Sequence, residues 1–333
     1  MVLRRDGAVV YGYTTTSTPL VLTLTSKNHR SRFRVNRSPQ NKNLWSVKLN
    51  ARSAGGEYNI SLSNEYQLIS SIHNVTFGEV FLCVSNLKDI IDSDHKKDMK
   101  GRSSDVRVHI VAPNPEPYEQ IATKISPQPE WISSISMLGK TSMGKLANLC
   151  ARSHRNHNNM PVGIYVSLYA DSELEAWYPA LEQLKCIGES RCVGRKPVVP
   201  LSESNYMECS QRPRESEESF WIPGNAQLYN GMISPYALNE INGIVLYTAT
   251  YQVQKMHCTL NHLARRWIRA FTHDADAREV PFLCVFNDES NHELRYRVLP
   301  SVDDSHNNSN KTMFLSSSVS LSSRIRNIMA LAP

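Results

Sequence analysis

Two groups of histidines have spacings that suit chemistry. His154 and His157 would share one face of a helix, an arrangement that can ligate zinc, but no Cys or carboxylate completes the set. The alternative is that they flank a helix end before Pro161. His257-Cys258 with His262 offers a Cys–His pair, and core or surface positions are the competing interpretation. We therefore expect no metal and no cofactor.

The chain has seven cysteines and no C-x-x-C pair, which argues against a zinc ribbon or a thioredoxin-type site. Cys186, Cys192 and Cys209 fall in one aperiodic stretch, a pattern typical of local disulfides in an oxidising compartment. Cys83 and Cys284 lie inside apolar, strand-like runs, so we expect both to be buried thiols.

Five N-x-S/T triplets also favour a secreted chain, although such triplets arise by chance. The candidate glycosylation sites are Asn36, Asn59, Asn74, Asn307 and Asn310. The first residues carry no apolar segment and no signal peptide, which conflicts with secretion.

The composition is that of an ordinary globular protein. Of the 333 residues, 41% are hydrophobic and 20% are charged, which excludes disordered and collagen-like classes. No apolar run reaches the roughly 18 residues of a membrane span. The net charge of +6 is small, and its clumps lack interleaved aromatic residues, so we expect no nucleic-acid partner. The simplest interpretation is a solvated edge strand and a solvated helix face. The clumps are Arg30, Arg32, Arg34 and Arg37, and Arg265, Arg266 and Arg269.

The first 76 residues predict a small β-sandwich. Short, alternating or β-branched segments follow one another at intervals of 8–14 residues without an intervening helix. The expected strands lie at 8–13, 20–25, 33–35, 44–49 and 58–62.

Residues 77–333 predict a three-layer α/β domain with a mostly parallel sheet, because buried strands alternate with helices. The continuous apolar runs are typical of strands buried on both faces. We expect an irregular Cys- and Pro-rich insertion at 186–224 and a sixth strand from Met313. The expected strands are 80–84, 106–111, 162–166, 244–247 and 281–286, and the expected helices are 141–152, 174–184 and 260–271.

Several segments, in one order, resemble the sialate O-acetylesterases, which are SGNH-type enzymes that remove acetyl groups from sialic acids. Phe77-Gly78-Glu79-Val80-Phe81-Leu82-Cys83 with Ser85-Asn86 is similar to F-G-D-V-W-L-C-S-G-Q-S-N-M. Pro161 to Trp177 resembles P-I-G-L-I-x-S-x-W-G-G-T-x-I-E-A-W. Leu228 to Pro235 resembles L-W-N-x-M-I-x-P, and Gly243 to Tyr247 resembles G-x-x-W-Y. Met1 to Arg4 resembles M-V-L-Q, so the likeness extends over nearly the whole chain.

The resemblance implies an esterase with a nucleophilic Ser, a His base and an orienting Asp. Ser85 is the residue that matches the nucleophile, but the Gly-Gln pair of the family's turn is missing. An ordinary polar serine at a strand end is the alternative.

The oxyanion-hole blocks differ from the family's pattern. The two glycines of W-G-G-T align with Ala170 and Asp171, and the carboxylate of Asp171 would oppose a developing oxyanion. The family's Asn aligns with Gln252, which has an extra methylene.

The family's Asp and His have no counterpart near the C-terminus. A D-x-x-H at Asp303 and His306 precedes the last expected strand, and we take it as a low-ranking base and orienter or as a surface loop. The first and last residues match positions inside the family's length, so the chain is expected to be truncated at both ends.

Three hypotheses follow. The first is an active esterase on O-acetylated sialic acid or a related glycan, secreted or lysosomal as the family is, with Ser85 as nucleophile. The second is an inactive or weakly active homologue that binds glycans, with Tyr169, Trp177, Tyr229 and Tyr251 stacking on sugars; core packing is the alternative for Trp177 and Tyr229. The third is an incomplete product of an active gene, which the point changes at Ala170 and Asp171 disfavour.

Overall fold

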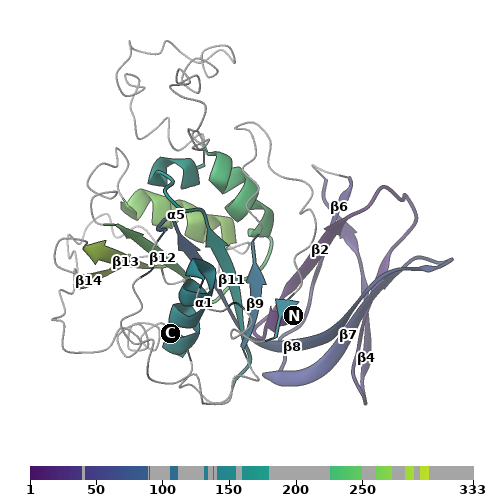
Figure 1. Ribbon diagram of the computed structural model, residues 1–333. Helices are drawn as coiled ribbons and strands as arrows, with labels where there is room; N and C mark the ends of the chain where they lie inside the picture. Colours follow the sequence, from purple (N-terminus) through teal and green to yellow (C-terminus); the bar gives the residue numbers. More distant parts are fainter. Residues whose placement is uncertain are drawn as a thin grey trace, which may run out of the picture.

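The computed structural model describes twelve segments of the chain, which are drawn in colour in Figure 1. These segments are residues 1–39, 42–88, 90, 106–111, 131–133, 138, 141–154, 160–179, 226–249, 260–271, 282–288 and 293–299. The expected insertion at 186–224 and the expected strand from Met313 lie outside them.

The N-terminal strands form two sheets around one core. Strands β3 (Val21–Thr25), β4 (Arg30–Arg34) and β7 (Gly55–Ser63) form an antiparallel group, and β2 (Val9–Tyr13), β6 (Leu44–Lys48) and β5 (Asn36–Arg37) form a separate three-stranded sheet. The alternation seen in the sequence sends every second side chain inward. The shared core includes Leu22, Leu24, Trp45, Val47, Ile60 and Leu62.

Strand β8 (Leu68–Ser85) runs without interruption through the expected domain boundary at residues 76–77. Its first half pairs antiparallel with β7, and its second half pairs parallel with β11 and β12. The short strand β1 (Val2–Arg4) lies parallel to it at Thr76–Gly78. Residues 68–74 of β8 are exposed, whereas nearly all of residues 75–85 are buried, so one strand serves both cores.

The central sheet has the order β10-β9-β11-β8-β12-β13-β14. The predicted runs are confirmed by strands β9 (Val106–Ile110), β11 (Val162–Leu168), β12 (Gly243–Ala249) and β13 (Phe282–Asp288). From β9 through β11, β8 and β12 to β13, each strand is parallel to the next one in the sheet. The edge strands β10 (Trp131–Ile132) and β14 (Glu293–Leu299) are antiparallel and were not predicted. The chain therefore has an α/β architecture with a mixed, mainly parallel sheet.

Helices cover both faces of this sheet (Figure 1). Helix α1 (Ser142–His154) packs on one face through Leu146, Ala147 and Cys150, as predicted. The other face carries the helical turns η2 (Leu174–Trp177), η4 (Tyr229–Ile233) and η5 (Ser234–Tyr236), and helix α5 (Leu260–Phe271), which was predicted. Of the expected helix at 174–184, the structure shows a single 3₁₀ turn that ends at Trp177; residues 178 and 179 are not helical, and residues 180–184 lie outside the described residues.

One cysteine prediction is wrong and one is confirmed. Cys83 of β8 forms a disulfide with Cys150 of α1, with their Cα atoms 6.6 Å apart. The apolar run around Cys83 signals burial but says nothing about a partner 67 residues away. Cys284 is fully buried on β13, as expected.

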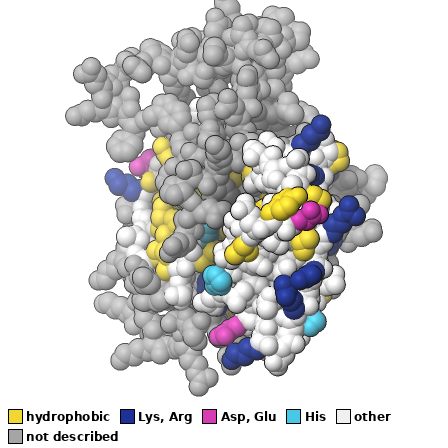
Figure 2. All heavy atoms as spheres, turned by 90° about the vertical axis from the view of Figure 1, so that its right-hand side faces the viewer, with side chains coloured by type: hydrophobic (Ala, Val, Ile, Leu, Met, Phe, Trp, Pro, Cys, Tyr) yellow, Lys and Arg dark blue, Asp and Glu magenta, His cyan; other side chains and the backbone are white. Residues whose placement is uncertain are grey.

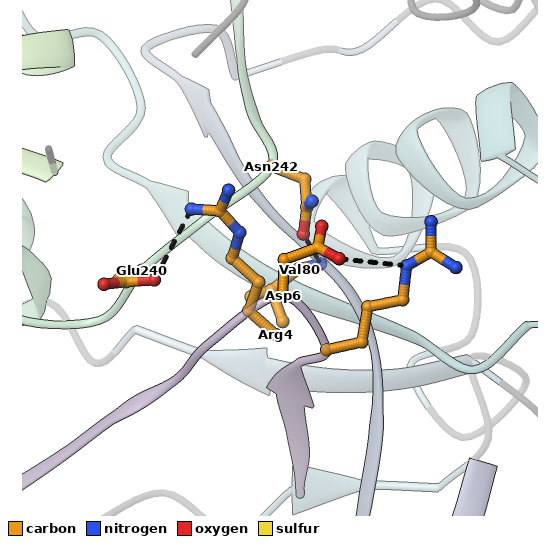
Figure 3. A network of polar contacts seen from close by, with 6 residues as sticks. Arg4, Asp6, Val80, Glu240 and Asn242 are labelled. Atoms are coloured by element: carbon orange, nitrogen blue, oxygen red, sulfur yellow. Dashed lines mark hydrogen bonds and ion pairs between the residues drawn. The ribbon is translucent and has the colours of Figure 1, made fainter. Parts of the chain in front are cut away.

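Close backbone approach and polar contacts hold the first strand, β8 and the loop before β12 together. A Cβ atom at Gly78 would lie 1.9 Å from the carbonyl oxygen of Pro161, so only glycine fits there. The side chain of Asn242 accepts a hydrogen bond from the N–H of Val80 at 2.8 Å, and Arg4 lies 3.6 Å from Glu240 (Figure 3). These contacts hold β8 in place around Gly78 and Val80, where it enters the central sheet.

A buried histidine lies among aromatic rings beside β9. The ring of His109 packs within 5.6 Å, centroid to centroid, of Trp131, Tyr165 and Tyr236. Neither of its nitrogens has a hydrogen-bond partner within the described segments. Burial, and then the positive charge of the amino terminus, lower the pKa of His109 to about 4.

Candidate functional site

The carboxyl end of β8 is the topological switch point of the sheet. The chain lays β11 and β9 on one side of β8 and then crosses to lay β12 and β13 on the other side. Ligands of open parallel sheets bind outside the carboxyl ends of the strands at such a point. The candidate site therefore consists of the residues that follow β8, β11 and β12.

Ser85 ends β8 in a closed environment. Its side chain has no exposed surface, and it follows the alternation of Phe81 and Cys83, which face helix α1. Its Oγ accepts a hydrogen bond from the N–H of Leu87 at 3.1 Å. The carbonyl oxygen of Ser85 accepts another from the N–H of Tyr169 at 3.1 Å. The hydroxyl thus stabilises the turn after β8, and its role as a nucleophile stays a prediction.

Asn86 connects this turn to the loop after β11. Its side-chain Nδ2 donates to the carbonyl oxygen of Ser172 at 2.9 Å, and its main-chain carbonyl oxygen accepts a hydrogen bond from the N–H of Asp171 at 3.0 Å. Asp171 has a φ of 57°, in the left-handed region that glycine adopts without strain. The backbone therefore keeps a conformation that suits a glycine at this position. Asp171 is exposed and Ala170 beside it is half-buried.

A series of hydrogen bonds connects the loop that carries Asp171 to η2 and α5. The Oγ of Ser172 donates to the carbonyl of Tyr169 at 2.8 Å and accepts from the indole Nε1 of Trp177 at 3.0 Å. The indole of Trp267 in α5 donates in turn to the carbonyl of Trp177 at 3.0 Å. Trp177 is 1% exposed, so the core interpretation of this residue is confirmed.

Three buried polar atoms on this part of the sheet have no hydrogen-bond partner among the described residues: Oδ1 of Asn86, Oγ1 of Thr248 and Oγ of Ser167. Tyr247 of β12 pairs with Ser85, the last residue of β8, and Thr248 and Asn86 are the next residues along the chain from these two. Buried polar groups are normally satisfied, and a bound water or ligand would supply the missing partner. Sequence reasoning did not single out Asn86 or Thr248, although a polar residue directly after an apolar strand was the available signal.

Aromatic side chains contribute less to this edge than the sequence suggested. Tyr169 is half-buried after β11, and Tyr229 is half-buried in η4. Burial raises the pKa of the Tyr229 hydroxyl, so it stays protonated near neutral pH. Tyr251 lies outside the described residues.

Several predicted site residues are not described. Gln252, Asp303 and His306 fall outside the described segments, as do the triplets at Asn307 and Asn310. The described triplets are exposed on strands, at Asn36, Asn59 and Asn74. The Oδ1 of Asn74 accepts a hydrogen bond from Arg107 at 3.0 Å.

No helix of the described segments is long and apolar enough to span a bilayer. In the same segments, no group of three or more His, Cys, Asp and Glu side chains gathers as a metal site would require.

Comparison with known proteins gives a likeness among solved structures. No family profile matches the sequence. No curated protein matches it either. A type I pullulanase from Bacillus subtilis in complex with maltose matches over 27% of this chain with a TM-score of 0.19, which is too low to bear on the fold.

The crystal structure of a carbohydrate acetylesterase from Xanthomonas citri matches over 84% of this chain, with a TM-score of 0.55 and 18% identity. This chain spans 57% of that esterase's length. At this identity the likeness concerns architecture: the protein has a carbohydrate-esterase-like fold.

Proposed function

We propose that the protein binds an O-acetylated sialic acid or a related acetylated glycan at the carboxyl end of β8 and hydrolyses it slowly or not at all. The observation that carries this proposal is the state of Ser85, whose hydroxyl is fully buried and occupied by the N–H of Leu87. A nucleophilic serine has to face both its substrate and a base that removes its proton. Ser85 meets neither condition among the described residues.

The electrostatics of the loop after β11 support the same proposal. Asp171 brings a negative charge to the position where the resembling family has a glycine. Acyl transfer develops negative charge on the carbonyl oxygen, and hydrogen-bond donors rather than carboxylates stabilise it. Removal of one donor from an oxyanion hole costs about 10²–10³ in kcat, so an opposing charge keeps any turnover slow.

Recognition is assigned to Asn86 and Thr248, whose Oδ1 and Oγ1 atoms have no hydrogen-bond partner among the described residues. Both side chains are buried as Ser85 is, so binding requires the turn after β8 to open toward the ligand. The hydroxyl of Thr248 can donate to an ester carbonyl, and Oδ1 of Asn86 can accept from a sugar hydroxyl. A few convergent polar groups in an otherwise apolar setting are typical of small-ligand sites.

The finer assignments belong to the same proposal. They are an SGNH-type α/β domain over 77–333, a β-sandwich domain over 1–76, and a secreted or lysosomal protein that carries glycans at its exposed triplets. The shared core of the first 76 residues supports the sandwich.

A second candidate function is an active esterase with Ser85 as nucleophile. Ser85 does lie at the end of a central parallel strand, where esterases of this kind place their serine. This alternative requires a base outside the described residues, such as His306 with Asp303, and a turn that opens to release the hydroxyl.

One experiment separates the two functions. The purified protein is given an aryl acetate and 9-O-acetylated sialic acid, beside Ser85→Ala and the control Thr76→Ala, which removes a buried hydroxyl from the same strand β8 away from its carboxyl end. Background rates in all three support the binding function. Turnover that Ser85→Ala alone abolishes overturns it.

Binding is measured separately by calorimetry with acetylated and de-acetylated sialic acid. We expect saturable binding of the acetylated sugar and at least tenfold weaker binding by Thr248→Val, which keeps the shape of the side chain and removes the hydroxyl. Equal binding of both sugars, or no binding, would contradict the assignment.

A further inference from the structure

A second binding surface is carried by the outer face of β4, β3 and β7, on the side of these strands opposite their core. On β4 the side chains alternate: Phe33 packs against the N-terminal core, whereas Arg30, Arg32 and Arg34 are exposed on the other face. Among the described strands, β4 pairs with β3 alone, so this arginine row lies along an edge of the described sheet.

Within the described residues, the guanidinium groups of these three arginines make no ion pair. The ion pairs of the described segments join Arg4 to Glu240 and Arg5 to Asp6, and none of them involves the arginine row. Arg37, which belongs to the same basic clump in the sequence, differs because its guanidinium donates to the carbonyls of Thr16, Thr18 and Lys42. The row is therefore available to an external anion.

Hydroxyl side chains adjoin the row on the same face. Across the sheet, Arg30 lies beside Thr25 and then Asn59, Arg32 beside Thr23 and then Ser61, and Arg34 beside Val21 and then Ser63. The hydroxyls of Thr25, Ser61 and Ser63 make no side-chain hydrogen bond within the described part of the chain. The surface thus offers both cations and neutral donors.

The net positive charge of the chain is carried by the N-terminal part, to which these strands belong. Residues 1–76 contain ten Lys and Arg against three Asp and Glu, a net charge of +7 in a chain whose total is +6. Figure 2 looks at the side where Figure 1 places β4 and β7, and dark-blue cationic side chains are spread there among white, yellow and magenta ones. A polyanion approaching from solution meets a positive field on this side.

The geometry points to a sulfated polysaccharide as the occupant, and we propose that this face binds one. Same-face residues of a strand repeat about every 6.8 Å, so the arginine row extends over roughly 13 Å and requires a ligand with several anionic groups. A sulfate offers three terminal oxygens, of which the guanidinium fork takes two and a neighbouring hydroxyl can take the third. Single-stranded nucleic acids instead need aromatic side chains on which bases stack, and the cross-strand neighbours named above include no aromatic residue.

The test uses immobilised and soluble heparin as the sulfated probe, hyaluronate as the carboxylated polysaccharide and an oligothymidylate as the nucleic acid. The triple variant Arg30→Gln, Arg32→Gln, Arg34→Gln is compared with Arg265→Gln, Arg266→Gln, Arg269→Gln on α5, which removes the same charge elsewhere. Asn59 shares this face, and a glycan on it would cover the β7 side, so the arginine row is proposed to bind in chains without that glycan. Protein produced in bacteria supplies such chains for the test.

We expect heparin affinity to fall at least tenfold in the β4 variant and to change less than threefold in the α5 variant. The slope of log affinity against log salt should fall by about two to three, on the order of one released counterion per arginine. An equal loss in both variants would show a response to net charge alone and overturn the proposal. Hyaluronate or oligothymidylate binding as tight as heparin binding would overturn it as well. The single variant Arg32→Gln, with circular dichroism of each protein, excludes misfolding as the cause.

Discussion

The buried His109 should make the stability of the protein depend on pH in a way that one substitution removes. Its ring lies among Trp131, Tyr165 and Tyr236, and burial lowers its pKa from 6.5 to about 4. In the unfolded chain the ring has its ordinary pKa, so between pH 6.5 and pH 4 the unfolded state binds a proton that the folded state does not. The free energy of unfolding therefore decreases as the pH falls through this window.

The two pKa values set the size of this effect. From pH 7 to pH 5 the His109 contribution to the free energy of unfolding falls by about 2 kcal/mol, and by pH 4 the loss approaches about 3 kcal/mol. His109→Phe cannot take up the proton and fills a similar aromatic position. The difference in unfolding free energy between the two proteins should therefore change by about 2 kcal/mol over this interval, in favour of the variant at low pH.

Urea unfolding of both proteins at pH 7, 6 and 5 measures this difference. Tyr165→Phe is the matched control, because it alters the same aromatic cluster and keeps the histidine. It should follow the pH dependence of the wild type. If His109→Phe also keeps that dependence, His109 does not remain neutral in the folded protein and the reasoning is refuted.

Three further predictions concern backbone and covalent features. Gly78→Ala should lower the free energy of unfolding by about 1–3 kcal/mol, because the new Cβ overlaps the carbonyl oxygen of Pro161. Urea titrations measure this loss, and a variant as stable as the wild type would contradict the close approach. Asp171→Gly should raise stability by up to about 1 kcal/mol and Asp171→Ala should lower it, since φ is positive there, and the reverse order of melting temperatures would count against this. The Cys83–Cys150 disulfide should appear in non-reducing peptide maps, and Cys83→Ala with Cys150→Ala should cost about 4 kcal/mol, as a closed loop of this length implies. Unchanged stability of that double variant would argue against the bond.

The sequence predicted the elements whose pattern is local. The apolar runs of β9, β11, β12 and β13 and the periodic face of α5 are local signals, and all five elements formed where expected. Strand β14 was missed although Leu294, Tyr296 and Val298 alternate with polar residues as a half-buried strand requires.

The geometry of the candidate site depends on turn paths and on contacts between distant parts of the chain, which could not be predicted from the sequence. The position of Ser85 at a strand end was readable from the run before it, but the occupation of its hydroxyl by Leu87 depends on the path of the turn. Asp171 gave no sign of its left-handed backbone, and only the resemblance to a glycine position indicated it. The partner of Cys83 could not be read from spacing, because pairing depends on the approach of α1 to β8.

The continuous strand β8 has a consequence for how the protein folds and unfolds. Its residues belong to the N-terminal core at Val75 and Phe77 and to the sheet core from Val80 onward, with no loop in between. A crossing without a linker leaves no hinge, so neither half can lose its packing without releasing a strand of the other. The two regions should therefore melt in one cooperative transition, and a protease should find no cleavable joint near residue 76 while the protein is native.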